Sequence, residues 1–226
     1  MRIELSEKDD GFQKLYGVML AIYYAVLVGL AIYWFSLSDY YQLFQTFANM
    51  ALPVVYLLVY RILGLKRTFK LEAVILAFTF MAYSLGVAGR WYHIVPYYDK
   101  IMHALSGAFT MFLALPAFYW LKSEKKIKSE DCALAVAFCL CATLAVAGIW
   151  EIVEYIINLV TGIDLQNVAA SGVGDTMQDM IVCLAGALFM LIPMLGYYRR
   201  GKAGFLMDAV FAFCRNNPGL YAKQAD

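Results

Sequence analysis

Ionisable side chains occur at helical spacing inside apolar stretches of the second half of the sequence. Asp99 and His103 are four residues apart, so they share one face of a helix. Glu151 and Glu154 are three residues apart and share one side of a second helix. An ionisable residue near the centre of a membrane helix costs roughly 2.5–3.5 kcal/mol on insertion scales, so each one is a candidate functional residue.

A third acidic pair, Asp175 and Asp179, opens a later apolar stretch. With a helical rise of 1.5 Å per residue, Asp179 and His103 should each lie about 9 Å inside the outer boundary of the membrane. Glu151 should lie deeper, about 16 Å from the outer end of its helix. All three pairs are expected to point into the leaflet that faces away from the cytoplasm, where they can converge.

The formal charge of such a cluster indicates what else it needs. The five carboxylates named above total −5, and two nearby basic residues, Arg90 and Lys100, supply +2, which leaves −3. Uncompensated charge in a low-dielectric environment requires protons or bound cations. Carboxylate oxygens with one imidazole suit Mg, Mn or Ca, with Zn or Fe possible. The expected ligands of this divalent metal are Asp99, His103, Glu151 and Asp179.

The remaining polar residues predict a reaction. Glu154 or Asp175 would activate water as a general base, and Arg90 and Lys100 would bind an anionic ligand. The leading hypothesis is a metal-dependent enzyme, a hydrolase or transferase, acting on a lipid or polyprenyl-phosphate head group at the outer leaflet. Two alternatives use the same residues. One is a small cation- or proton-coupled transporter, and the other is a lipid-binding accessory protein without catalysis.

Each candidate residue also has a purely structural interpretation. Asp99 and Asp175 can cap helix N-termini, and His103 can be a packing residue. The two glutamates can be protonated and hydrogen-bonded between helices. Arg90 and Lys100 can extend toward the membrane interface without binding a ligand.

The elements that must position these residues are membrane helices. The chain has 226 residues, of which 63% are hydrophobic and 15% are charged, whereas soluble domains are about 45–50% apolar and about 25% charged. Six stretches are long and apolar enough to span a bilayer. They lie near residues 13–35, 46–65, 71–91, 99–121, 131–160 and 174–197. The predicted fold is an all-α, polytopic transmembrane helical bundle.

The basic residues predict its orientation. Sixteen of the 18 Lys and Arg fall in one alternate set of connections and termini, so both termini should be cytoplasmic. The expected organisation is a cytoplasmic segment 1–12, a membrane domain 13–197 with short connections near 36–45, 92–98 and 161–173, and a cytoplasmic tail 198–226. Within the tail, residues 204–213 are expected to form an interfacial helix or to pack on the bundle.

Composition also limits the partners. A net charge of +1 without a concentrated basic face gives no sign of a nucleic-acid partner, so membrane lipids are the expected partners. The five cysteines show no metal-type spacing and are expected to be free thiols. The oligomeric state does not follow from the sequence.

Three motifs in order carry a family resemblance. They are Asp99-Lys100-x-x-His103, Glu151-x-x-Glu154-Tyr155, and Asp175-Thr176-x-x-Asp179-Met180 followed by Gly186. Over about residues 90–190 this pattern resembles the YjdF-like family of uncharacterised bacterial inner-membrane proteins. It is more distantly similar to the VanZ-like group, which is associated with glycopeptide-antibiotic tolerance. The resemblance implies a multi-pass protein of the bacterial cytoplasmic membrane and the same acidic site. Cys183 departs from the VanZ-like pattern, so the detailed activity is not expected to transfer.

Overall fold

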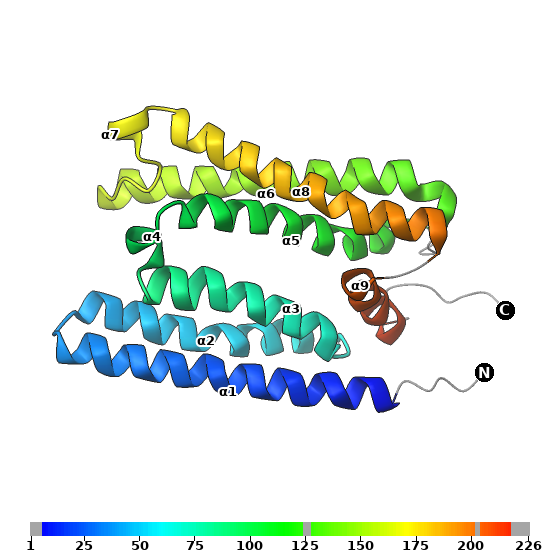
Figure 1. Ribbon diagram of the computed structural model, residues 1–226, viewed down its shortest axis with the longest axis horizontal. Helices are drawn as coiled ribbons and strands as arrows, with labels where there is room; N and C mark the ends of the chain where they lie inside the picture. The colour runs from blue at the N-terminus through cyan, green and yellow to red at the C-terminus, as the bar shows by residue number, and fades with distance from the viewer. Residues whose placement is uncertain (1–5, 124–127, 202–203, 218–226) are drawn as a thin grey trace. The chain divides into compact units, whose positions relative to one another are not determined.

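The computed structural model describes residues 6–123, 128–201 and 204–217, and every regular element in these ranges is a helix (Figure 1). In chain order the elements are α1 (Ser6–Ser36), α2 (Tyr40–Ile62), α3 (Phe69–Thr79), the π-helix η1 (Phe80–Ala88), α4 (Trp91–Ile94), α5 (Tyr98–Leu121), the 3-10 helix η2 (Ser129–Asp131), α6 (Cys132–Thr161), α7 (Val168–Ser171), α8 (Gly174–Arg200) and α9 (Phe205–Asn216).

Six helices among the described residues are long and apolar enough to cross a membrane. Their bounds are Gly11–Ser36, Tyr40–Ile62, Phe69–Ala88, Tyr98–Leu121, Cys132–Thr161 and Gly174–Arg200. The prediction of an all-α, six-span membrane protein is therefore confirmed. Its placement in the bacterial cytoplasmic membrane stays a prediction, as does the cytoplasmic location of both termini.

The second span begins earlier than the sequence indicated. Helix α2 starts at Tyr40 because the carboxylate of Asp39 caps it, accepting a hydrogen bond from the backbone N–H of Gln42 at 3.0 Å. The connection from α1 is only Leu37–Asp39, with Ser38 at a positive φ of 57°. The predicted loop near 36–45 was therefore too long, and the predicted start of the span near residue 46 was wrong.

The third span changes its helical type. It runs as an α-helix to Thr79 and continues as η1 to Ala88. Arg90, at a φ of 58°, then turns the chain into α4. The carbonyl of Ala88 at the end of η1 accepts a hydrogen bond from the indole N–H of Trp34 at 2.8 Å. This contact joins the C-terminal end of α1 to the end of the π-helix.

The described chain divides into two compact units. Unit 1 contains residues 6–98 and 212–217, and unit 2 contains residues 99–123, 128–201 and 204–211. In unit 1, α1 packs against α2, α3 and η1, and its core is formed by Tyr16, Tyr23, Leu27, Leu76 and Ala88. In unit 2, α6 and α7 both pack against α8.

Two glycines bring α5 and α8 into backbone contact within unit 2. A Cβ atom at Gly107 would overlap the carbonyl of Cys183, and one at Gly186 would overlap the carbonyl of Ala104. Small residues that allow such close approach are typical of membrane helix pairs. Gly148, in contrast, faces open space, so it has no packing role of this kind.

The predicted helix in the tail is present as α9 (Phe205–Asn216). Its apolar side chains, including Met207, Val210 and Phe211, are buried. Its location at the membrane interface or against the bundle stays a prediction.

Candidate metal centre

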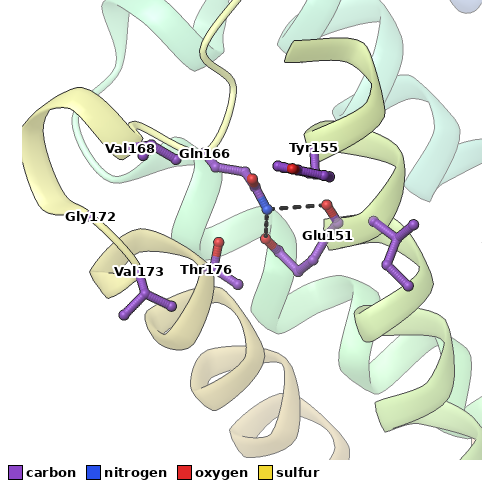
Figure 2. A pocket seen from close by; sticks show the side chains of 8 residues that line it. Glu151, Tyr155, Gln166, Val168, Gly172, Val173 and Thr176 are labelled. Atoms are coloured by element: carbon purple, nitrogen blue, oxygen red, sulfur yellow. Dashed lines mark hydrogen bonds between the residues drawn. The ribbon is translucent and has the colours of Figure 1, made fainter. Parts of the chain in front are cut away.

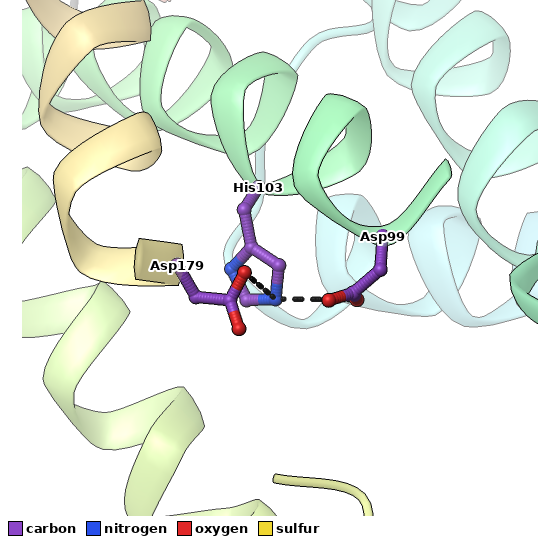
Figure 3. Close-up of side chains that lie close together, drawn as sticks. All are labelled: Asp99, His103 and Asp179. Atoms are coloured by element: carbon purple, nitrogen blue, oxygen red, sulfur yellow. Dashed lines mark ion pairs between the residues drawn. The ribbon is translucent and has the colours of Figure 1, made fainter. Parts of the chain in front are cut away.

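Helices α5 and α8 bring Asp99, His103 and Asp179 together (Figure 3). The Nε2 atom of His103 lies 3.5 Å from Oδ1 of Asp99 and 3.8 Å from Oδ1 of Asp179. One potential ligand atom from each residue lies within 4.8 Å of the other two. Asp179 is almost fully buried, and the side chain of Asp99 is partly exposed. The cluster therefore reaches from the helix interface toward the protein surface.

Local helix geometry explains this arrangement. Helix α5 begins at Tyr98, so Asp99 and His103 lie one turn apart on the same face. Helix α8 begins at Gly174, so Asp179 lies in its second turn. Gly107 is one turn beyond His103, and the contact of its backbone with Cys183 is one turn beyond Asp179. The close approach of the two helices thus lies directly below the ligand atoms.

Lys100 lies inside the acidic cluster. Its ammonium nitrogen is 2.5 Å from Asp175 Oδ1, 2.7 Å from Asp179 Oδ1 and 3.3 Å from Asp99 Oδ2. These ion pairs make Lys100 a counter-ion for three carboxylates in this structure. Its predicted role in binding an anionic ligand stays a prediction, and the ammonium would have to leave these partners to perform it.

Asp175 has partners for both carboxylate oxygens. Oδ1 pairs with Lys100, and Oδ2 accepts a hydrogen bond from the side-chain amide of Asn167 at 2.8 Å. These bonds lie outside the helix backbone, so capping of α8 does not account for Asp175.

Glu151 and Glu154 are both buried on α6 but have different partners. Glu151 accepts from the amide of Gln166, whose Nε2 is 3.1 Å from both Oε2 and the backbone carbonyl of Glu151. Glu154 Oε1 accepts from the indole N–H of Trp150 at 2.7 Å. Glu154 also interacts electrostatically with His103 and Asp99, whereas Glu151 is not among the three clustered ligand residues. The structure thus groups three of the four predicted ligands.

A shallow pocket adjoins Glu151 (Figure 2). It has a volume of about 380 Å³. Its lining residues are Glu151, Ile152, Tyr155, Gln166, Val168, Gly172, Val173 and Thr176. This volume falls within the range of small-molecule sites, about 300–1,000 Å³.

Sequence reasoning missed two amides in the connection between α6 and α8. Gln166 binds Glu151 and the adjacent Asn167 binds Asp175, so one short segment contacts a carboxylate on each helix. Asp164 orders this segment by accepting from the backbone N–H groups of Val168 and Ala169, both at 2.9 Å. The available signal was Asp164 followed by adjacent Gln and Asn in a connection treated only as a loop.

Arg90 belongs to unit 1, where it is exposed at the turn between η1 and α4. Its predicted role in binding an anionic head group stays a prediction.

The donor set fits a divalent cation. Two carboxylates and one imidazole provide hard oxygen ligands and one borderline nitrogen, a combination that Mn²⁺, Fe²⁺ and Zn²⁺ accept. Three protein ligands also leave coordination positions open for water or substrate, as in catalytic metal sites. Lys100 would compete with such an ion for Asp179.

Comparison with known proteins identifies a family. A family profile described as "Predicted membrane protein (DUF2238)" matches residues 17–200, which is more than half of the chain. No curated protein and no solved structure matches. Kinship with an uncharacterised membrane protein family is thus confirmed, whereas the YjdF-like name and the VanZ-like relationship receive no support. The chain belongs to the DUF2238 family of predicted membrane proteins.

Proposed function

We propose that this protein is a divalent-metal-dependent enzyme embedded in the membrane, acting on a lipid or polyprenyl-phosphate head group at the outer leaflet. One observation carries the proposal: Asp99, His103 and Asp179 each offer a ligand atom within 4.8 Å of the other two, at the ends of membrane helices. A metal bound there would act as a Lewis acid and lower the pKa of a bound water.

Glu154 is better suited than Asp175 to accept a proton from water. Trp150 occupies only one of its carboxylate oxygens, and its electrostatic interaction with His103 indicates that it lies near the cluster. Asp175, in contrast, has partners on both oxygens. Glu151, held by Gln166 in the pocket wall, would orient the head group or complete the cation's coordination.

Lys100 would link cation binding to phosphate binding. In this structure its ammonium neutralises Asp175 and Asp179. A divalent ion at Asp179 would repel the ammonium, which could then pair with a phosphate oxygen of the head group. The site would thus gain a phosphate-binding cation only when the metal is present.

The direct test is metal binding by the full chain, purified without chelator and followed by elemental analysis and by the thermal midpoint during Mn²⁺ titration. Binding to the folded state should raise the midpoint as Mn²⁺ exceeds its dissociation constant. Asp179→Asn should abolish the rise. Asp131→Asn is the matched control, because Asp131 is also buried in unit 2 and ion-paired, to Lys122 at 2.6 Å.

The enzymatic part needs a separate measurement. Release of phosphate, or of a free head group, from labelled polyprenyl phosphates and phospholipids in nanodiscs should require Mn²⁺ and be lost in Glu154→Gln. If Mn²⁺ binds but no substrate of either class turns over, the metal site stands and the enzyme assignment fails. If elemental analysis finds no metal and Mn²⁺ does not shift the thermal midpoint, the proposed metal site is wrong.

One observation favours a second candidate. Because Lys100 already neutralises part of the cluster, these carboxylates can be stable without metal and exchange protons instead. A proton-coupled transporter would then be the better assignment. Proton-driven solute uptake into proteoliposomes, abolished by Asp179→Asn in the absence of any divalent ion, distinguishes it from the enzyme.

A further inference from the structure

The inward face of α2 in unit 1 is polar although the helix spans the membrane. Gln42, Thr46 and Asn49 follow at helical spacing and are buried, whereas Phe44 and Phe47 on other faces are exposed. With a rise of 1.5 Å per residue, this polar face extends about 10 Å along the helix. It packs against α1 and η1.

A proline further along α2 organises this face. Pro53 has no N–H, so the carbonyl of Asn49, four residues earlier, loses its helical partner. The hydroxyl of Tyr23 donates to this carbonyl at 2.7 Å, and the neighbouring Tyr24 donates to the carbonyl of Met50 at 3.2 Å. Helix α1 thus supplies the hydrogen bond that the proline removes from Asn49, as is required inside a membrane.

Three buried side-chain atoms of α2 and η1 have no hydrogen-bond partner among the described residues. They are Oε1 of Gln42, Oδ1 of Asn49 and Oγ of Ser84. The three residues are 8%, 4% and 0% exposed. A buried polar atom without a partner costs about 1–3 kcal/mol by mutational data, and lipid offers no substitute for water.

The π-helix explains why Ser84 differs from other buried hydroxyl residues. Thr46, Thr79 and Thr143 each donate to the carbonyl four residues earlier, at 2.8 Å. Ser84 lies within η1, where the wider turn displaces that carbonyl. Its hydroxyl lies beside that of Tyr23, which donates its own proton to Asn49, but the two hydroxyls do not meet hydrogen-bond geometry.

We propose that unit 1 binds ordered water inside the membrane, between α1, α2 and η1, at Asn49 Oδ1 and Ser84 Oγ, with a further water at Gln42 Oε1. Buried waters usually make about three hydrogen bonds to polar groups that otherwise lack partners. The Tyr23 hydroxyl, which can still accept, provides a third partner beside Ser84 and Asn49. The two amide oxygens require an occupant that donates.

The local charge favours water over a cation. The polar residues named here, which are Gln42, Thr46 and Asn49 of α2, Ser84 of η1 and Tyr23 of α1, are all uncharged in their ordinary states. A monovalent cation held there would lack a counter-charge in a low-dielectric environment. Water supplies two donors without charge, so it suits acceptor oxygens and a hydroxyl.

Ser84→Ala in the full chain tests the proposal, because wet and dry sites give shifts of opposite sign. In a dry site the substitution removes an unpaired hydroxyl, so the thermal midpoint should stay or rise. In a hydrated site the substitution removes a hydrogen bond of the bound water. For a protein of this size, the loss of one such bond should lower the thermal midpoint by about 2–4 °C. Thr143→Val, which removes a fully buried hydroxyl with its own helical acceptor, is the matched control and should shift the midpoint less.

Radiolytic footprinting in ¹⁸O-labelled water provides a second readout. Tyr23 and Tyr119 are both 1% exposed, and the hydroxyl of Tyr119 pairs with Tyr198. Bound water beside Tyr23 should make it incorporate oxygen several-fold faster than Tyr119. Equal labelling together with an unchanged or raised midpoint in Ser84→Ala would overturn the proposal. A midpoint that depends on Na⁺ or NH₄⁺ in the wild type and not in Ser84→Ala would assign the site to a cation instead.

Discussion

Lys100→Met is the most informative single substitution in the acidic cluster. The side chain is of similar length but carries no charge, so Asp99, Asp175 and Asp179 lose their shared counter-ion. The charge of this group of four changes from −2 (three carboxylates and one ammonium) to −3. The substitution therefore tests whether the cluster binds a divalent metal in place of the lost ammonium.

The magnitude follows from the burial of the ion pairs. The Lys100 side chain is 20% exposed, and Asp179 is almost fully buried. Removing one partner of a buried pair costs about 3–5 kcal/mol, because the other charge is left uncompensated. For a protein of this size, each kcal/mol lowers the thermal midpoint by about 2–4 °C, so the loss without metal should be about 6–20 °C.

Divalent metal should reverse most of this loss. At 100 times the dissociation constant, a ligand that binds only the folded state stabilises it by about 2.7 kcal/mol. The substitution also removes the ammonium that competes with the metal for Asp179, so Lys100→Met should bind Mn²⁺ more tightly than the wild type. The assay is the thermal midpoint of detergent-solubilised protein across an Mn²⁺ titration, beginning in chelator.

Lys122→Met is the matched control. Lys122 is 19% exposed and pairs with the buried Asp131 at 2.6 Å, also within unit 2, but among the described residues it adjoins no cluster of potential metal ligands. Its destabilisation should be insensitive to Mn²⁺. If Mn²⁺ rescues both variants equally or rescues neither, the cluster is an ion-pair network without a metal site and the reasoning is refuted.

Three further predictions follow from other features. Gly107→Val should weaken Mn²⁺ binding at least tenfold or prevent folding. Gly148→Val, at a glycine that faces open space, should leave the Mn²⁺ affinity measured by titration calorimetry almost unchanged. Mn²⁺ affinity should fall as the pH is lowered through the titration range of the ligands, because bound carboxylates must be ionised and His103 neutral; an affinity measured by calorimetry that rises on acidification would contradict the assigned ligands. If both termini are cytoplasmic, cysteines at Ser38 and Ile163 should react with an impermeant maleimide on intact cells, and those at Leu63 and Ser123 should not; the reverse pattern would place the site on the cytoplasmic side.

Hydrophobic length and helical spacing predicted the spans and the pairing of Asp99 with His103, because both depend on local periodicity. The early start of α2 also had a local signal in Asp39, a favourable N-cap residue, but the span was placed by hydrophobic length alone. The position of Lys100 had no such signal. A basic residue near a span end usually extends to the interface, and only the approach of α8 brings Asp175 and Asp179 within its reach.

Other features depend on contacts between distant residues. The bonds from Gln166 to Glu151 and from Asn167 to Asp175 require the connection after α6 to fold back over two helices. The π-helix η1 has no proline or charge that marks it in the sequence. The exclusion of Glu151 from the three-residue cluster likewise depends on how α6 is rotated, which spacing within α6 alone cannot determine.

The glycine contact between α5 and α8 has a consequence for movement. Since the backbones touch at Gly107 and Gly186, the two helices cannot slide or separate there without losing contact over a whole turn on each side. His103 on α5 and Asp179 on α8 each lie one turn from this contact, so they should move together as parts of one rigid body. Any conformational cycle that opens the site must then swing α6, or the segment with Gln166 and Asn167, away from a fixed α5–α8 pair. The moving element would be α6 or the segment with Gln166 and Asn167, while the helices that carry the ligand residues stay fixed.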